Sequence, residues 1–161
     1  MTDWTTTAAR PHESRLRLDS YPVVDVVQAR YGDMDANGHL NNLALESLHE
    51  NARATMNRSL FPEIYDVATR RLRLVTSQNA VHFLAEAHWP ALIHTGAAVG
   101  RIGRTSFVAS TGLFIDDRCI GVCDTVLVLV GGPGDPGGPV PLSDDARAKL
   151  QTVALGAARS A

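Results

Sequence analysis

The chain of 161 residues lacks the features that identify several common classes of protein. No apolar run approaches the ~20 residues that cross a bilayer, and the polar N-terminal stretch contains no apolar segment typical of a secretory signal. The formal net charge of −2 gives no basic field that would attract phosphates along a nucleic acid. We therefore expect a cytoplasmic protein that binds neither membranes nor nucleic acid.

Cysteine is scarce, and the other potential metal ligands are scattered. Cys119 and Cys123 lie four residues apart on one face of an expected strand, which at ~3.3 Å per residue is beyond the reach of a disulfide. We expect them to be free thiols. His82, His88 and His94 have no neighbouring carboxylates at the short spacings that metal ligands usually show. The sequence thus predicts no metal and no cofactor.

Two common hydrolase motifs are also missing, and the composition is that of a globular protein. There is neither a Gly-x-Ser-x-Gly elbow nor a phosphate-binding loop, so serine-hydrolase and nucleotide-hydrolase functions lack support. Hydrophobic residues make up 45% and charged residues 20% of the chain. Residues 1–20 show no periodicity and are expected to form a poorly ordered arm. Residues 21–161 are expected to form one domain.

The first half of that domain predicts a strand, a loop and a long helix. Residues 23–30 are rich in β-branched side chains. Residues 43–58 contain neither glycine nor proline, and their apolar positions recur at helical spacing. These apolar positions are Leu45, Leu48, Ala52 and Met56. Glu46 and Arg53 on the same helix are expected to be solvated.

The second half predicts four extended segments, a flexible loop and a short helix. The segments span residues 71–87, 92–102, 105–115 and 119–130. The breaks between them at Trp89-Pro90, Gly103-Arg104 and 116–118 are short enough for hairpins. A mobile loop is expected at 131–139, followed by a helix capped by Ser143. The fold class is therefore α+β, an antiparallel sheet of about five strands packed on one long helix.

The loop 30–42 between the first strand and the long helix is unusually rich in carboxylates and amides. Its start, Asp33-x-Asp35-x-Asn37-Gly38, matches the start of an EF-hand calcium loop. That site needs a bidentate glutamate six residues after the glycine, where this chain has Ala44. The calcium interpretation is therefore rejected.

A structural interpretation explains part of the loop. Asn41 or Asn42 can accept the free amide hydrogens of the first helical turn, and with Asn41 as the cap, Leu40 and Leu45 would pack together across the helix start. Turn formation also accounts for Gly32 and Gly38. It gives no reason for the three titratable residues of the loop, Asp33, Asp35 and His39.

A catalytic interpretation explains those three as well. A helix N-terminus offers free N–H groups and the positive end of a dipole, which can stabilise the oxyanion formed when a carbonyl is attacked. An aspartate shortly before the helix could serve as nucleophile or general base. His39 could act as a base or could fix the loop by hydrogen bonding. These parts are sufficient for hydrolysis of an acyl group.

The pattern D-x-D-x-x-G-H-x-N-N followed by a helix resembles the 4-hydroxybenzoyl-CoA thioesterase-like family of hotdog-fold acyl-CoA thioesterases. The resemblance extends loosely from Val23 to Leu150. It implies hydrolysis of an acyl-CoA or acyl-carrier-protein thioester by a homodimer or homotetramer, with coenzyme A as part of the substrate. It also implies that Asp35 is the catalytic carboxylate and that the backbone amide of Asn42 polarises the thioester carbonyl.

The resemblance suggests roles for further residues. Gly38 would allow close approach of the backbone to the substrate, and His39 and Asn41 would shape the loop. Arg104, just before a Ser-Phe pair, would contact the phosphates of coenzyme A. In a second branch of these thioesterases the catalytic carboxylate is a helical glutamate, which makes Glu50 the reserve candidate.

Two further features bear on the acyl pocket and on the function. Many relatives carry an aromatic residue where this chain has Leu45, which affects the shape of the acyl pocket. A non-catalytic acyl-CoA binding or sensing protein on the same fold is the alternative function. Asp35 distinguishes the two functions, because a binding protein does not need a carboxylate beside the thioester.

Overall fold

The structure, a computed structural model, describes residues 9–132 and 137–157. Its main elements are β1 (Val23–Gln28), α1 (Asn42–Leu60), α2 (Pro62–Tyr65), β2 (Leu72–Phe83), β3 (Leu92–Ile102), β4 (Ser106–Ile115), β5 (Arg118–Gly131) and α3 (Asp144–Thr152). Three short 3-10 helices complete it: η1 (Glu13–Leu16), η2 (Leu18–Ser20) and η3 (Tyr31–Asp33).

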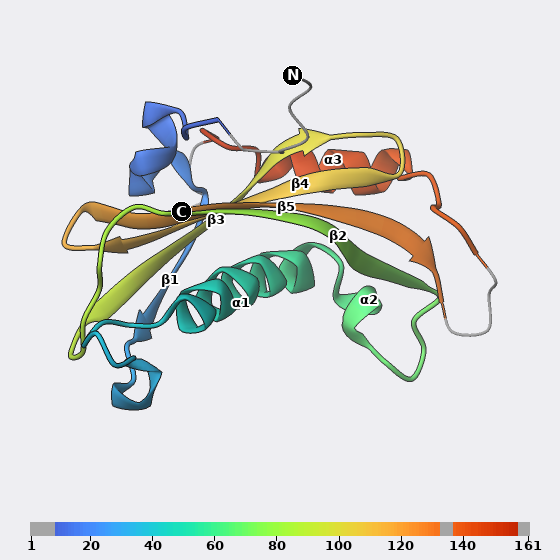
Figure 1. Ribbon diagram of the computed structural model, residues 1–161. Helices are drawn as coiled ribbons and strands as arrows, with labels where there is room; N and C mark the ends of the chain where they lie inside the picture. Colours follow the sequence, from blue (N-terminus) through green and yellow to red (C-terminus); the bar gives the residue numbers. More distant parts are fainter. Residues whose placement is uncertain (1–8, 133–136, 158–161) are drawn as a thin grey trace, which may run out of the picture.

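One antiparallel sheet of five strands forms the body of the molecule, in the order β1-β3-β4-β5-β2. Helix α1 lies along one face of this sheet, while η1, η2 and α3 lie on the other (Figure 1). The loop that leads into α1 lies at the end of the sheet where β1 finishes and β3 begins (Figure 1). The predicted α+β class, with about five antiparallel strands and one long helix, is confirmed.

The strand connections match the prediction at two of three places. The links β3–β4 and β4–β5 are hairpins, and both turn residues of the second, Asp116 and Asp117, have positive φ angles as a type I′ turn requires. The hairpin predicted at Trp89-Pro90 is wrong. β2 pairs with β5 at one edge of the sheet, whereas β3 pairs with β1 and β4, so segment 84–91 is a crossover.

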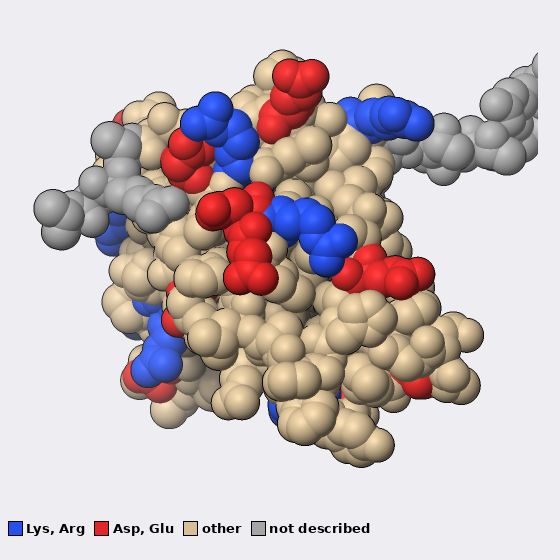
Figure 2. Space-filling view, turned by 90° about the vertical axis from the view of Figure 1, so that its left-hand side faces the viewer, with Lys and Arg blue, Asp and Glu red and all other residues tan. Residues whose placement is uncertain are grey.

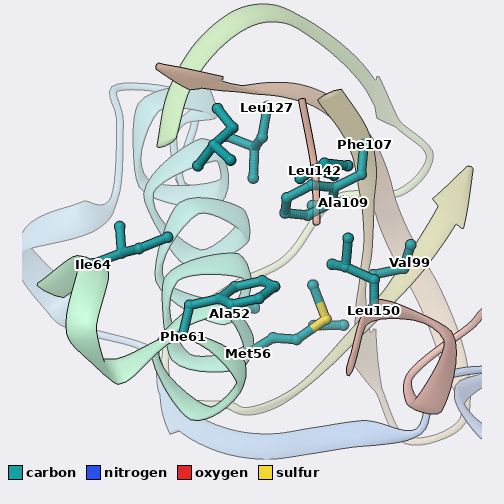
Figure 3. Packing of buried hydrophobic residues seen from close by; sticks show 12 residues of the cluster. Ala52, Met56, Phe61, Ile64, Val99, Phe107, Ala109, Leu127, Leu142 and Leu150 are labelled. Atoms are coloured by element: carbon teal, nitrogen blue, oxygen red, sulfur yellow. The ribbon is translucent and has the colours of Figure 1, made fainter. Parts of the chain in front are cut away.

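Helix α1 begins and packs as its sequence predicts. The side chain of Asn41 accepts a hydrogen bond from the amide of Ala44 and so caps the first turn. Leu45, Ala52 and Met56 on the inward face are each at most 5% exposed. Figure 3 shows Ala52 and Met56 within the main core cluster, beneath side chains of β3, β4 and β5.

The segment before β1 differs from the prediction. Glu13–Ser20, expected to be part of a poorly ordered arm, instead forms η1 and η2 against the sheet. Arg15 anchors it, because its guanidinium lies 2.8 Å from Asp124 and also donates to Tyr21 Oη. Most of the Arg15 side chain is buried, with 10% exposed. Residues 1–8 of the predicted arm lie outside the described residues.

The C-terminal part follows the prediction where it is described. Of the predicted mobile loop 131–139, residues 133–136 lie outside the described residues, and Pro139 bridges back to Val130 of β5. Ser143 caps α3 by accepting from the amide of Ala146. Cys119 and Cys123 are free thiols, as predicted. In the described part of the chain, no helix is both long and apolar enough to span a membrane.

Candidate active site

The loop between β1 and α1 is held in one shape by its own side chains. Arg30 and Asp33 form a bidentate ion pair with both N–O distances at 2.9 Å. The carbonyl oxygen of Asp33 accepts from the backbone amide and the side-chain amide of Asn41, at 2.9 and 2.8 Å. Asp33 therefore has a structural role, and Asp35 is the carboxylate that the loop presents.

A tight turn around Asp35 fixes the position of its side chain. Its backbone amide donates to the His39 carbonyl at 2.9 Å, and its carbonyl accepts from Gly38 at 3.1 Å. Gly38 has a φ of +82°, and a side chain built there would meet only open space. Glycine is therefore favoured by the left-handed backbone rather than by crowding. The amide of Asn37 donates to Asp35 Oδ1 at 2.8 Å.

The Asp35 carboxylate is ionised at neutral pH. Desolvation acts to raise its pKa, but the backbone amides of Asn37 and His39, together with the His39 ring, outweigh this and hold the pKa below its ordinary value. His39 Nδ1 lies 4.0 Å from Asp35 Oδ1. With 32% of its side chain exposed, Asp35 can still meet a substrate from solvent.

Two donors of the α1 N-terminus have no partner in the helix. The first four N–H groups of a helix lack intrahelical acceptors. Here the amide of Asn41 donates to the Asp33 carbonyl, and that of Ala44 donates to the Asn41 side chain. The amides of Asn42 and Leu43 have no acceptor within the helix and could donate to a bound oxygen. The sequence predicted the backbone amide of Asn42 as a donor. The structure adds the backbone amide of Leu43, which was not predicted.

A second loop supports the first. Segment 84–91, the crossover between β2 and β3, lies against the loop that carries Asp35. The amide of Leu40 donates to the Ala87 carbonyl at 2.7 Å, and His88 Nδ1 lies 2.9 Å from the Gly38 carbonyl. The position of Asp35 therefore depends on two chain segments that are far apart in sequence.

Titratable side chains gather where these two loops meet. His39 Nε2 lies 3.6 Å from Glu86 Oε1, and the ring centroids of His39 and His88 are 5.8 Å apart. In the described ranges, no group of three or more His, Cys, Asp or Glu side chains is placed to hold a metal ion. The His39 ring lies beside Asp35 and also faces solvent, with 28% of its side chain exposed.

Glu50, the reserve candidate, lies apart from Asp35 in the same chain. It follows Asn42 by eight residues, which is ~12 Å along a helix that rises ~1.5 Å per residue. Its carboxylate lies 3.2 Å from the guanidinium of Arg53, and 71% of its side chain is exposed. One chain therefore does not place both carboxylates beside the amide of Asn42.

The solvated position predicted for Arg53 is wrong. Glu46 is exposed as predicted, but Arg53 is only 7% exposed and donates to Thr125 Oγ1 at 3.0 Å as well as to Glu50. Arg53 lies on the inward side of α1, where the Thr125 hydroxyl of the sheet and the Glu50 carboxylate of the same helix accept its hydrogen bonds. The helix thus covers a polar region of the sheet in addition to an apolar core.

His49 is a second buried polar residue of α1 whose burial the sequence interpretation missed. It is 2% exposed, and its Nδ1 lies 2.8 Å from Thr111 Oγ1. Burial, followed by the nearby charges of Arg15 and Arg53, lowers the pKa of His49 to about 3. The imidazole is therefore neutral. Its Nε2 is buried without a hydrogen-bond partner among the described residues.

The sequence did contain a signal for His49. Position 49 follows Leu45 by four residues and precedes Ala52 by three, which is the spacing of the buried stripe. The burial of His49 was not predicted because buried positions were inferred from apolar residues alone, and histidine is polar. Buried polar residues on such a stripe are of particular interest, since they need partners.

Arg104 lies at the other end of the sheet from Asp35. It is an exposed residue in the turn between β3 and β4, whereas the Asp35 loop adjoins the start of β3 (Figure 1). The 11 residues of β3 separate the two ends by about 33 Å at ~3.3 Å per residue. One chain therefore does not bring Arg104 together with Asp35.

The end of the molecule that carries the Asp35 loop, which faces the viewer in Figure 2, has a surface of mixed charges. On the face shown in Figure 2, basic and acidic side chains lie next to one another over the upper half, and the lower half is largely uncharged. No continuous area of positive charge covers the described residues of this face. The mixed pattern gives no strong field that would select a large polyanion.

Comparisons with known proteins agree with this architecture. A family model described as the thioesterase-like superfamily matches residues 29–150. No curated protein matches the chain. Among solved structures, the PA5185 protein from Pseudomonas aeruginosa is 20% identical, with 88% of this chain and 98% of that chain covered and a TM-score of 0.75.

Two further structures extend the comparison. The PA2801 protein from Pseudomonas aeruginosa, a proposed thioesterase, is 25% identical over 80% of this chain and 97% of its own, with a TM-score of 0.68. A thioesterase from Thermus thermophilus, solved with coenzyme A and Zn, is 22% identical over 83% of this chain and 95% of its own, with a TM-score of 0.67. The similarity confirms the predicted hotdog fold.

Proposed function

The chain belongs to the thioesterase-like superfamily, and from this we propose that it hydrolyses the thioester of an acyl-CoA, with Asp35 as the catalytic carboxylate. One observation carries the proposal. An ionised carboxylate held by a tight turn lies in the loop directly before a helix whose first two amides, those of Asn42 and Leu43, have no partner in the helix. These are the parts that attack on a thioester carbonyl requires.

The reaction follows from these groups. Asp35 takes a proton from water while the water oxygen bonds to the thioester carbon, and the carbonyl oxygen becomes an oxyanion that accepts from the amides of Asn42 and Leu43. The oxyanion then collapses, the C–S bond breaks, and the thiolate of coenzyme A takes the proton from Asp35. In the alternative route, Asp35 attacks the carbon itself to give a mixed anhydride, which water hydrolyses. The same carboxylate is essential to both routes.

We propose further that the protein works as a homodimer or homotetramer. The edge strand β2 pairs only with β5 among the described strands, and residues 75–79 of this edge are exposed. An unpaired edge invites pairing with a second copy. Assembly also offers a way to bring Arg104 or Glu50 of one copy close to Asp35 of another, which one chain does not do.

Release of free thiol from a panel of acyl-CoA substrates tests the function. The proposal expects turnover with at least one acyl-CoA and loss of turnover in Asp35→Asn. Tight binding of an acyl-CoA without thiol release would favour the alternative, a non-catalytic binding or sensing protein. Sedimentation of a fully active, strictly monomeric species would contradict the proposed assembly.

A further inference from the structure

The crossover 84–91 carries a histidine, His88, that contacts the loop of Asp35 and has no role in the proposed chemistry. Ala87 is only 2% exposed, whereas its neighbours Glu86 and His88 are exposed. The segment thus places one side chain in the core and presents the next one outward beside the loop. A histidine in this position can act either on the substrate or on the loop, and its contacts favour the loop.

The crossover is itself held in place, which a segment that positions another must be. At its start, two backbone amides donate to the Ile120 carbonyl at 2.9 and 3.2 Å, and at its end the Ala91 carbonyl accepts from the amide of Ala29 at 2.9 Å. Between them, the guanidinium of Arg118 donates to the Glu86 carbonyl at 3.2 Å. The backbone that carries the histidine is therefore tied to neighbouring segments along its length.

His88 donates a hydrogen bond to the loop that carries Asp35. Its Nδ1 lies 2.9 Å from the Gly38 carbonyl oxygen, and because a carbonyl can only accept, the hydrogen must be on Nδ1. Two residues further on, the amide of Leu40 donates to the Ala87 carbonyl at 2.7 Å. Two neighbouring hydrogen bonds therefore join the loop to the crossover, and one of them depends on a side chain.

Gly38 connects this contact to Asp35. The amide of Gly38 donates to the Asp35 carbonyl at 3.1 Å, and the amide of Asp35 donates to the His39 carbonyl at 2.9 Å, so residues 35–39 form a closed turn. Gly38 has a φ of +82°, and glycine has the greatest backbone freedom of all residues. A contact from outside the turn therefore restricts its most flexible residue, and that contact comes from His88.

Protonation of His88 does not decide whether this bond forms. Nδ1 carries its hydrogen both in this neutral tautomer and in the imidazolium. The other nitrogen, Nε2, lies 3.9 Å from Glu86 Oε2, and the ring centroid lies 5.8 Å from that of His39. Glu86 can pair with a protonated Nε2 without competing for the Nδ1–H. A role that depends on Nδ1–H is therefore independent of the titration of His88, unlike general acid or base catalysis.

We propose that His88 is a positioning residue, whose hydrogen bond to the Gly38 carbonyl holds the 35–39 turn in the conformation that presents the Asp35 carboxylate to the thioester. The inference rests on the proposed thioesterase function and adds to it a residue that acts on the loop rather than on the substrate. Because 57% of the His88 side chain is exposed, the contact affects the geometry of the turn more than the stability of the fold.

Thiol release and thermal unfolding of three His88 variants test the proposal. His88→Ala removes the donor, and kcat should fall by about ten- to a hundredfold, with KM near its wild-type value and the melting temperature within roughly 4 °C of wild type. His88→Asn places an amide nitrogen at the δ position, as in histidine, and should restore most of kcat with an unchanged pH profile. His88→Gln places its nitrogen one bond further from the backbone and should restore less.

His12→Ala is the matched control. His12 is also an exposed histidine whose Nδ1 bonds the backbone of a surface segment, since it accepts from the amide of Ser14. It lies at the start of η1, on the face of the sheet opposite α1 (Figure 1). Loss of its contact should leave kcat at the wild-type value.

Hydrogen exchange of the Gly38 amide gives a readout that does not depend on activity. This amide donates to Asp35 within the turn, so its exchange should be about tenfold faster in His88→Ala and close to wild type in His88→Asn. Absence of thiol release in wild type, together with this pattern of exchange, would support the contact and overturn the hydrolase.

The remaining outcomes overturn the positioning role and leave the hydrolase intact. They are an unchanged kcat in His88→Ala, a lower kcat without faster Gly38 exchange, and an equal loss of kcat in His88→Asn and His88→Ala. Loss of one limb of the pH profile in His88→Asn would also overturn it, because His88 would then exchange protons during the reaction.

Discussion

Acid should destabilise this protein through His49, and the size of that contribution can be worked out from its burial. Desolvation, followed by the charges of Arg15 and Arg53, lowers the pKa of His49 from 6.5 to about 3 on folding. Between these two values the unfolded chain binds a proton that the folded chain does not. Stability is therefore highest above pH 6.5 and falls as the pH drops toward 3. At 1.36 kcal/mol per pH unit, moving from pH 7 to pH 5 costs about 2 kcal/mol.

Urea unfolding followed by circular dichroism at pH 7, 6 and 5 measures this loss. His49→Gln removes the titrating group, so wild type should lose about 2 kcal/mol more than the variant between pH 7 and pH 5. Other titrating groups contribute equally to both proteins and cancel in the comparison. Equal losses in the two proteins would show that His49 is not buried in its neutral form.

Three further predictions concern the loop, the N-terminal segment and the coenzyme. Asn41→Ala removes the helix cap and the side-chain hydrogen bond to the Asp33 carbonyl, and should lower the free energy of unfolding by about 1–2 kcal/mol in urea titrations together with a loss of activity; unchanged stability would contradict it. Arg15→Met leaves Asp124 without its ion pair and should cost about 2 kcal/mol, measured in the same way. Arg104→Ala should raise KM for acyl-CoA by roughly tenfold, ~1.4 kcal/mol, with a weaker salt dependence. An acyl-pantetheine thioester without the nucleotide should not distinguish this variant from wild type, and an equal loss with both substrates would refute a phosphate contact.

Local features of the fold could be predicted from the sequence because local residues determine them. The cap at Asn41 and the spacing of Leu45, Ala52 and Met56 specify where α1 lies and which side faces the sheet. The turn at Asp116-Asp117 likewise depends only on its neighbours. The motif before α1 identified the family for the same reason, since its residues are contiguous.

Features that depend on distant contacts could not be predicted. Arg15 and Asp124 are 109 residues apart, so nothing near Arg15 indicated that it would be buried. The place of β2 at the sheet edge follows from its pairing with β5, whereas a short link suggested pairing with β3. Arg53 was taken as solvated because its polar partners, such as Thr125, belong to another element.

Within the candidate site, the sequence supplied candidate residues but not their arrangement. The sequence could not show that Asp33 and Asp35 differ in role. Only the fold shows that the Asp33 carboxylate pairs with Arg30 and that its carbonyl accepts from the Asn41 side chain. The sequence placed Arg104 near the substrate, yet the turn that carries it lies at the far end of β3. Whether a second copy completes the site is a property of the assembly.

Thiol release by Asp35→Asn tests the central claim most directly. The substitution keeps the size of the side chain but removes its charge and basicity, so kcat/KM on the best acyl-CoA should fall by ~10²-fold or more while the folded structure is retained. Glu50→Gln, measured beside it, should cause the smaller loss. The contradictory result is near-normal hydrolysis by Asp35→Asn together with an inactive Glu50→Gln, which would move the catalytic carboxylate from the loop to helix α1.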